Sequence, residues 1–127
     1  MEVSRIRALR GPNLWTHHTA VEAIVRCQEN ELSIIDIPEF EARLRALFPE
    51  IGPLQATGHD DAIPLARVFE LATLALQAQA GCPVTFSRTT PTLEHGIFQV
   101  VVEYSEEDVG RLSLELAEQL VNAAINN

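Results

Sequence analysis

The chain has 127 residues, of which 46% are hydrophobic and 21% charged, and its formal net charge is −9. This length and composition predict one globular domain and exclude disorder, and no run reaches the roughly 18 apolar residues that a membrane span needs. The acidic charge excludes general nucleic-acid binding, which depends on a basic surface. It is compatible with a cationic or zwitterionic partner, although solubility is the commoner reason for such a charge.

The amino terminus and the cysteines indicate where the protein works. The first residues lack the apolar stretch of a signal peptide, so we expect a cytoplasmic protein. Cys27 and Cys82 have no metal-ligand spacing and are expected to be buried, reduced thiols.

Two strands are predicted near the amino terminus. Residues 5–10 alternate, with Ile6 and Ala8 on one side of a half-buried strand and arginines on the other. Residues 20–27 alternate as well, but they also fit a short helix capped by Thr19. We favour the strand.

A helix is predicted to begin at Asp36-Ile37-Pro38, with Asp36 as its cap. Its apolar face consists of Phe40, Leu44, Leu47 and Phe48. Pro49 ends it, and residues 49–59, which have no periodicity, predict a connecting loop.

Residues 60–81 predict the central helix of the domain. Asp60 or Asp61 is placed to cap it, Pro64 falls in its first turn, and Gly81 supplies the left-handed residue that commonly closes a helix. Apolar residues cover well over half of its circumference, so it must be covered on most sides. One narrow polar stripe remains, formed by Arg67, Glu70, Thr73 and Gln77.

The rest of the chain predicts a hairpin and a last helix. Residues 83–87 predict a short strand, 88–96 a turn, and 97–104 a second strand antiparallel to the first. Residues 105–108 resemble a capping box for a helix that extends to about Ala124. Its predicted apolar face consists of Val109, Leu112, Leu116 and Leu120.

The predicted order is therefore strand, strand, helix, helix, strand, strand, helix. It gives a single two-layer α+β domain over residues 1–127, with an antiparallel sheet of about four strands and three helices. The residues alone show no catalytic constellation, phosphate loop or nucleophile elbow. The four histidines are expected to be exposed loop residues: His17, His18, His59 and His95.

Residues 7–15, RALRGPNLW, resemble the opening of cyanophycin synthetases, which begin with a strand followed by an Arg-Gly-Pro-Asn-x-Trp segment. The likeness continues in the same order at residues 74–77, 80–81, 86–89, 96–104 and 110–111. The resemblance implies the amino-terminal domain of a longer ligase, whose ATP-grasp and Mur-ligase-like domains are absent from this chain. Such enzymes use ATP and magnesium to add Asp to a backbone and Arg to its side-chain carboxyl, which builds cyanophycin, a β-Asp-Arg polymer.

The resemblance further implies a non-catalytic docking domain that holds the growing polymer and needs no cofactor of its own. The implied partners are cyanophycin, the downstream domains and further subunits of a homo-oligomer, but neither nucleic acid nor a membrane. The alternative is a structural domain that packs against those domains or subunits.

Some members of that family carry a metallopeptidase site on a His-x-x-Glu-His helix, which this chain does not match. Arg67 and Leu71 occupy the two histidine positions, Glu70 is retained, and Ala75 replaces a carboxylate expected one turn further on. Zinc needs about three protein ligands, so we expect no metal and no peptidase activity. We expect Arg67 and Glu70 to form an ion pair on the helix surface instead.

A polymer with both charge types needs a binder with both charge types. The candidate polymer-binding residues are Arg7, Arg10, Asn13, Trp15, Arg88 and Glu103, with Arg5 and Glu94 as further candidates. Each arginine also fits a solvated strand residue, and Trp15 also fits a core or interface anchor.

Overall fold

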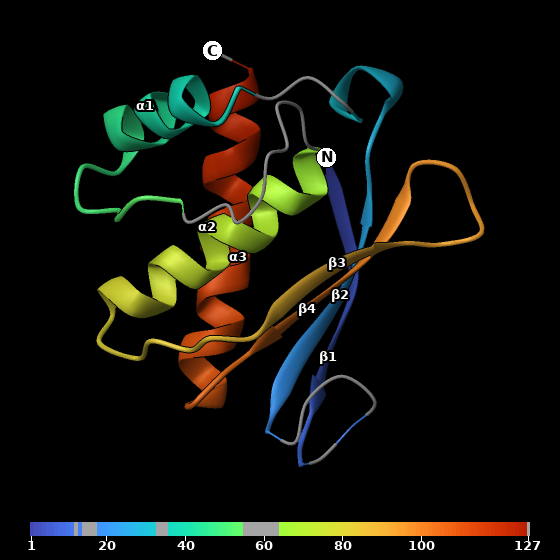
Figure 1. The fold of residues 1–127 in the computed structure, drawn as a ribbon, viewed down its shortest axis with the longest axis vertical. Helices are drawn as coiled ribbons and strands as arrows, with labels where there is room; N and C mark the ends of the chain where they lie inside the picture. Colours follow the sequence, from blue (N-terminus) through green and yellow to red (C-terminus); the bar gives the residue numbers. More distant parts are fainter. Residues whose placement is uncertain (12, 14–17, 33–35, 55–63, 127) are drawn as a thin grey trace.

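The computed structural model describes residues 1–11, 13, 18–32, 36–54 and 64–126. Its strands are β1 (Glu2–Leu9), β2 (Ala20–Arg26), β3 (Ser87–Pro91) and β4 (Ile97–Glu103). Its helices are α1 (Ile37–Leu47), α2 (Leu65–Gln79) and α3 (Glu107–Ile125), together with a short 3-10 turn at Glu29–Glu31. This order confirms the predicted α+β class (Figure 1).

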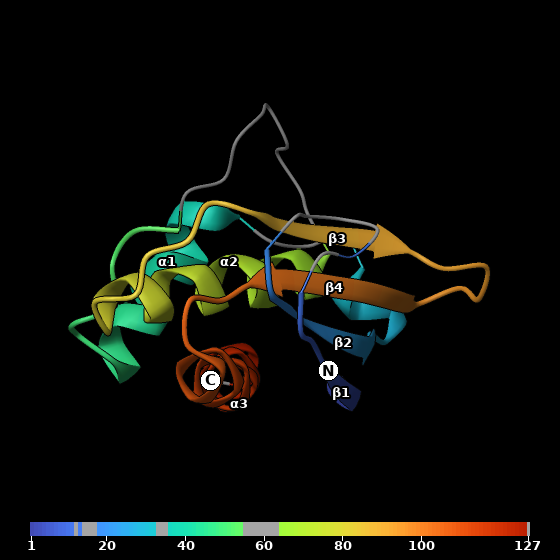
Figure 2. The same cartoon turned by 90° about the horizontal axis from the view of Figure 1, so that it is seen from below.

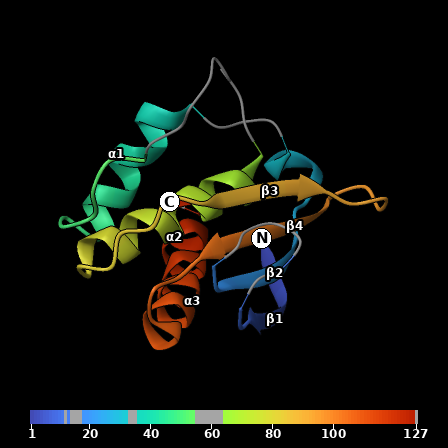
Figure 3. The same ribbon diagram turned by 60° about the horizontal axis from the view of Figure 1, so that its bottom comes forward.

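The four strands form one antiparallel sheet in the order β1-β2-β4-β3. Helix α2 packs along β3 and β4, α3 packs against β1 and β2, and α1 packs against α3. Figures 2 and 3 show all three helices on the same side of the sheet. No described helix covers the other side, which we call the open face.

Helix α2 is the central helix, as predicted, because it packs against β3 and β4 on one side and against α3 on another. Ten of its fifteen residues are buried, including the polar residues Glu70, Thr73 and Gln77. The helix begins at Leu65, so Pro64 occupies the cap position and not the first turn. Gly81 has φ +82°, the left-handed conformation expected at a helix end. Asp60 and Asp61 lie outside the described residues.

Strand β1 contains a β-bulge at Arg5, and the predicted opposite sides of Ile6 and Arg7 are confirmed. Ser4 pairs with Ile24 and Arg7 pairs with Glu22, so Arg5 and Ile6 together oppose a single residue of β2. Arg5 has φ +58°, and the extra residue changes which side chains point to which face. Ile6 packs against the core, while Arg7 remains on the open face beside Glu22.

Strand β2 resolves the ambiguity of residues 20–27 in favour of the strand. Val21, Ala23 and Val25 belong to the core cluster, which is the period of two that a strand predicts.

The prediction for the third strand is wrong. Residues 83–86 are not in a strand. Strand β3 covers Ser87–Pro91, so it shares only Ser87 with the predicted strand, and its other residues lie where the sequence predicts a turn. Thr89 and Thr90 suit a strand, and Pro91 is tolerated because β3 is an edge strand with β4 as its single neighbour. The hairpin with β4 is confirmed.

Helix α1 begins as predicted, since the side chain of Asp36 accepts a hydrogen bond from the Glu39 amide at 3.0 Å. Phe40 and Leu44 are buried, but Leu47 is 39% exposed, so the predicted apolar face is too wide.

Helix α3 differs from its prediction in two ways. Its cap residue is Glu106, and no side-chain hydrogen bond caps it, so the predicted capping box does not form. Its buried face consists of Gly110, Ser113, Leu114, Ala117, Val121 and Ala124. Of the predicted face, Leu112 is 63% exposed, whereas Leu116 and Leu120 are partly buried and pack against the core. Four of the six residues of the buried face are Gly, Ser or Ala, and at Gly110 the helix lies so close to Tyr104 that an added Cβ would be 2.8 Å from the Tyr104 Cβ.

The described thiols and histidines differ in their exposure. Cys27 is buried as predicted, but Cys82 is partly exposed. Burial raises the pKa of the Cys27 thiol. His18 and His95 are exposed as predicted, and His95 contacts Glu29 at 2.5 Å. His17 and His59 lie outside the described residues.

Candidate functional site

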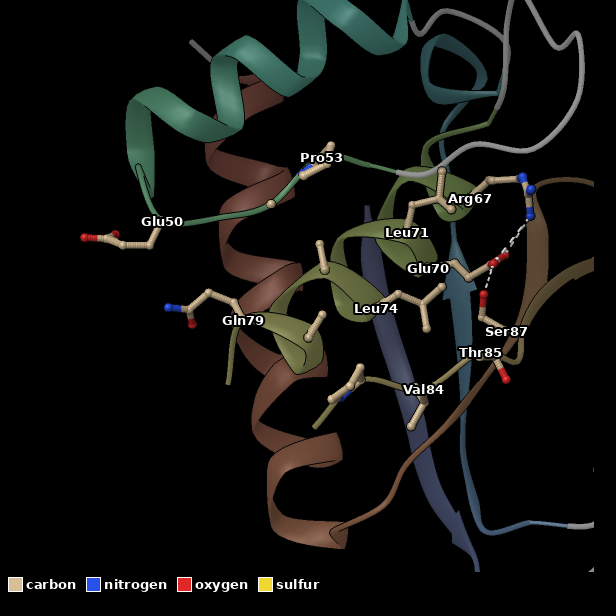
Figure 4. Close-up of a pocket in the computed structure, with 14 residues that line it drawn as sticks. Glu50, Pro53, Arg67, Glu70, Leu71, Leu74, Gln79, Val84, Thr85 and Ser87 are labelled. Carbon is tan, nitrogen blue, oxygen red and sulfur yellow. Dashed lines mark hydrogen bonds and ion pairs between the residues drawn. The ribbon is translucent and has the colours of Figure 1, made fainter. Parts of the chain in front are cut away.

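A pocket of about 640 Å³ lies beside α2, between that helix, the chain after α1 and the segment leading into β3. Figure 4 shows Arg67 and Glu70 at one end, near Ser87, and Glu50 and Gln79 at the other end. The wall between the two ends is apolar, formed by Pro53, Leu71, Leu74, Ala75, Ala78, Pro83 and Val84. An apolar pocket with a few polar groups at one end is the usual form of a small-molecule site.

The polar end of the pocket is built around the carboxylate of Glu70. Nη1 of Arg67 lies 3.1 Å from Oε1 and 3.4 Å from Oε2 of Glu70. Thr89 donates a 2.6 Å hydrogen bond to Oε1, and the Ser87 hydroxyl donates to Oε2. The side chain of Glu70 is only 2% exposed, whereas that of Arg67 is 24% exposed. The ion pair forms as predicted, but it is not a surface pair, because its acid is buried.

Local sequence explains this cluster. Arg67 and Glu70 are three residues apart on α2 and therefore lie on one side of the helix. Ser87 and Thr89 are two residues apart on β3 and therefore point to the same face, toward the helices. The polar stripe of α2 predicts the helix positions, but not the burial of Glu70, because polar helix stripes usually face water. The sequence does not predict the role of the Ser87 and Thr89 hydroxyls, because the predicted strand ends at Ser87 and does not include Thr89.

The open face holds a second group of charged residues. Arg7 on β1 lies opposite Glu22 on β2, and Nη2 of Arg7 is 3.1 Å from Oε1 of Glu22. Gln99 donates a 2.7 Å hydrogen bond to Oε2 of the same carboxylate. The register continues from Glu22 through Val101 to Arg88 on β3, which is exposed. Arg7, Glu22 and Arg88 thus form one row across the sheet, which we call the charged row.

Glu22 is the member of the charged row that is absent from the predicted binding residues. Its alternation with Val21 and Ala23 was the available signal, because it places Glu22 on the face opposite the core. Glu22 is only 5% exposed, and a buried carboxylate needs partners such as Arg7 and Gln99.

The remaining predicted site residues are not gathered at the charged row. Arg10 lies beyond β1 and forms a two-point ion pair with Glu107 at the start of α3, with N–O distances of 2.7 and 3.2 Å. The hydrogen bond from Arg10 holds the pKa of Glu107 below its usual range, and that pair also raises the pKa of Arg10. Asn13 donates to backbone carbonyls at Gly11 and His18, which gives it a structural role in this turn.

The other predicted binding residues lie on β4, in the bulge of β1 and in the β3–β4 turn, or outside the described residues. Glu103 lies on β4, on the side away from the core, and its backbone carbonyl accepts a 2.9 Å hydrogen bond from Gln77. Arg5 lies in the bulge of β1, and Glu94 is exposed in the β3–β4 turn. Trp15 lies outside the described residues.

The family model for the cyanophycin synthase-like N-terminal domain matches residues 22–126, which is most of the chain. The chain belongs to this family.

Curated relatives of this family agree with the assignment. The chain is 30% identical over 138 residues to the cyanophycin synthetase of Trichormus variabilis, covering 99% of this chain and 15% of that protein. It is 29% identical over 139 residues to that of Geminocystis herdmanii, covering 98% of this chain and 16% of the relative. The match to the Synechocystis protein is 30% over 139 residues, with coverage of 99% and 16%. The chain therefore spans about 15% of the length of these cyanophycin synthetases.

In this cyanophycin synthase-like domain, the positions at which the resemblance expects metal ligands line the pocket. Arg67 and Leu71 replace histidines and Ala75 replaces a carboxylate, and all three border the cavity. The side chains of Leu71 and Ala75 have no ligand atom, and both oxygens of Glu70 are engaged by Arg67, Ser87 and Thr89. The residues present do not fit a zinc site. Over the described residues, no group of three or more His, Cys, Asp or Glu side chains is placed to hold a metal ion.

None of the described helices is both long enough and apolar enough to cross a membrane.

Proposed function

We propose that this domain docks cyanophycin, the β-Asp-Arg polymer, on the open face of its sheet. The observation that supports it is the charged row, in which Arg7, Glu22 and Arg88 lie on three of the four strands, with Val101 of β4 between Glu22 and Arg88. The carboxylates of a β-Asp-Arg polymer can pair with the exposed guanidinium groups of Arg7 and Arg88, while Glu22, which is only 5% exposed, holds Arg7 in place. An arginine can bind a carboxylate through two parallel hydrogen bonds, which adds geometric selectivity to the attraction.

The exposure of Arg7 and Arg88 favours the open face as the docking surface. The side chain of Arg7 is 57% exposed although it contacts Glu22, so part of its guanidinium remains accessible. Arg88 is exposed and has no ion pair with a described residue. Glu103 lies on the same side of the sheet as a second acidic residue. Neighbouring strands are about 4.8 Å apart, so the row from β1 to β3 extends about 14 Å.

Docking gives the domain a place within a longer enzyme. In a cyanophycin synthetase, the ATP-grasp and Mur-ligase-like domains would use ATP and magnesium to add Asp and Arg, while this domain would be non-catalytic. Holding the polymer raises its effective concentration at the catalytic sites without a new contact at those sites. The setting we propose is a cytoplasmic homo-oligomer.

The test is a titration of the 127-residue chain with short soluble β-Asp-Arg peptides at low salt, followed by amide NMR shifts. We expect saturable shifts on β1, β2 and β3 that disappear at high salt, because exposed charges are screened. The double variant Arg7→Gln/Arg88→Gln should weaken binding at least tenfold. The matched control, Arg43→Gln/Arg45→Gln on α1, removes the same charge and should bind like the parent. Equal loss in both variants, or no shift at millimolar peptide, would refute docking on this face.

A second candidate function is a packing domain for downstream domains or neighbouring subunits. The observation that favours it is Leu112 on α3, which is 63% exposed beside partly buried Val109 and Leu116. An apolar contact there should be insensitive to salt, unlike polymer docking. In the full-length enzyme, Leu112→Glu should then weaken domain or subunit association while leaving peptide binding unchanged.

A further inference from the structure

The pocket beside α2 contains an arginine whose hydrogen-bonding capacity is only partly used. A guanidinium has five N–H donors, and both hydrogen bonds from Arg67 to Glu70 leave from Nη1. Neither Nε nor Nη2 of Arg67 donates a hydrogen bond to a described residue. The side chain is 24% exposed and borders the cavity. The guanidinium therefore has donors left for a molecule in the pocket.

Glu70 fixes Arg67 without competing for that molecule. Its carboxylate is 2% exposed and its oxygens accept from three donors: Arg67, Ser87 and Thr89. Replacing only one partner of a buried ion pair is destabilising, whereas replacing both partners by apolar residues often is not. Stability alone therefore does not require this ion pair. The cluster holds an arginine in one orientation at the end of an apolar cavity, which is the form of a preorganised anion receptor.

The shape of the pocket restricts what can bind. Beyond the guanidinium, the wall is formed by apolar side chains, among them Leu71, Leu74, Ala75 and Val84. Figure 4 places Glu50 at the far end, with its carboxylate pointing away from Arg67. A ligand that contacts both the Arg67 guanidinium and the apolar wall needs a planar anion with two oxygens to face the guanidinium. It also needs a short aliphatic part to lie along the wall.

We infer that this pocket binds a carboxylate on a short aliphatic stem, with Arg67 as its receptor and Glu70 as the residue that positions Arg67. The site lies on the helix side of the sheet, whereas the charged row lies on the open face, so this inference does not rest on the docking proposal. Two sources share the required chemistry: a free small carboxylate, and the terminal carboxylate of a short peptide.

The test uses the 127-residue chain with two probes, valerate and the β-Asp-Arg dipeptide, each followed by amide NMR shifts. n-Pentylamine, which has a similar stem and the opposite charge, is the ligand control. We expect saturable shifts at Leu71, Leu74 and Ala75 with the carboxylates and none with the amine. Binding of valerate alone would identify a small-carboxylate site. Tighter binding of the dipeptide, lost when its carboxylates are amidated, would identify a peptide site.

Three variants identify the receptor group. Arg67→Gln should weaken binding about tenfold or more, because a hydrogen bond to a charged group is lost. Arg67→Gln could lose binding because it disturbs the fold. Ala75→Leu leaves the ion pair intact and should abolish binding by filling the cavity, so it tests the pocket independently of that effect. Glu50 lies at the far end of the same pocket, so the Glu50→Gln variant should bind valerate like the parent. Unchanged affinity in Arg67→Gln, or equal shifts with the amine, would overturn the inference. Arg7→Gln/Arg88→Gln should retain binding in the pocket, so the two proposals can fail separately.

Discussion

Thr89 on β3 donates a 2.6 Å hydrogen bond to Glu70 on α2, so an edge strand is tied to the central helix through a side chain that is only 2% exposed. Ser87 donates to the same carboxylate from two residues earlier on the strand, and Arg67 contacts it from the preceding turn of the helix. This arrangement makes Glu70 both the support of the pocket and a structural link between layers.

Glu70→Ala should lower the free energy of unfolding by about 3–5 kcal/mol, because it leaves a partly buried arginine and two hydroxyls without their acceptor. Glu70→Gln should cost less, since the amide oxygen still accepts from the hydroxyls. Urea denaturation measures both values. Glu39→Ala is the control, because Glu39 is 64% exposed in its pair with Arg43 and should contribute about 0.5 kcal/mol or less. Equal losses in the two alanine variants would contradict a buried role for Glu70.

Leu114→Ala should destabilise the domain by about 2–5 kcal/mol, because Leu114 is 1% exposed and its truncation leaves a cavity. Leu112→Ala removes the same atoms two residues earlier, but Leu112 is 63% exposed, so the effect should remain within about 0.5 kcal/mol. Thermal or urea unfolding of the two variants checks which face of α3 is buried. A larger loss for Leu112 would restore the face that the sequence predicts.

The sequence predicts the order of elements and the central helix because these depend on strong local signals. Helix α2 has a nearly continuous apolar surface, and Asp36 and Gly81 mark helix ends by their own chemistry. Those signals require no knowledge of what packs against them.

The predictions are wrong where a contact with a distant part of the chain determines which side chains are buried. Helix α3 carries two apolar stripes, and the choice between Leu112 and Leu114 depends on the space beside α2. The charged row and the pocket could be predicted only in part, because they too depend on distant contacts. Arg7 and Arg88 were identified, but their neighbour Glu22 and the burial of Glu70 depend on sheet register and on the position of β3. The bulge in β1 has no clear local signal, and it allows Val3 and Ile6 both to pack against the core although they are three residues apart.

Gly110→Ala should destabilise the domain by about 1–3 kcal/mol, although alanine favours helices over glycine by about 1 kcal/mol. A Cβ on Gly110 would lie 2.8 Å from the Cβ of Tyr104, closer than such atoms approach without a shift. Gly52→Ala is the control, because its Cβ would meet no atom within 4 Å. Thermal unfolding compares the two. A stabilised Gly110→Ala variant would show that α3 can move away from Tyr104 at no cost.

The Arg10–Glu107 pair should make stability depend on acid pH. The hydrogen bond from Arg10 lowers the pKa of Glu107 in the folded protein below its ordinary value of 4.5. A carboxyl group with a lowered folded pKa contributes stability above its unfolded pKa and loses it as pH falls through the folded value. Arg10→Gln should therefore be less stable than the parent at pH 7, and the gap should close below about pH 4.5. Urea unfolding from pH 7 to pH 3 measures that gap. Arg26→Gln is the control, since Arg26 has no ion pair with a described residue, and its difference from the parent should not follow the same profile. A gap for Arg10→Gln that stays constant down to pH 3 would show that the pair does not set the pKa of Glu107.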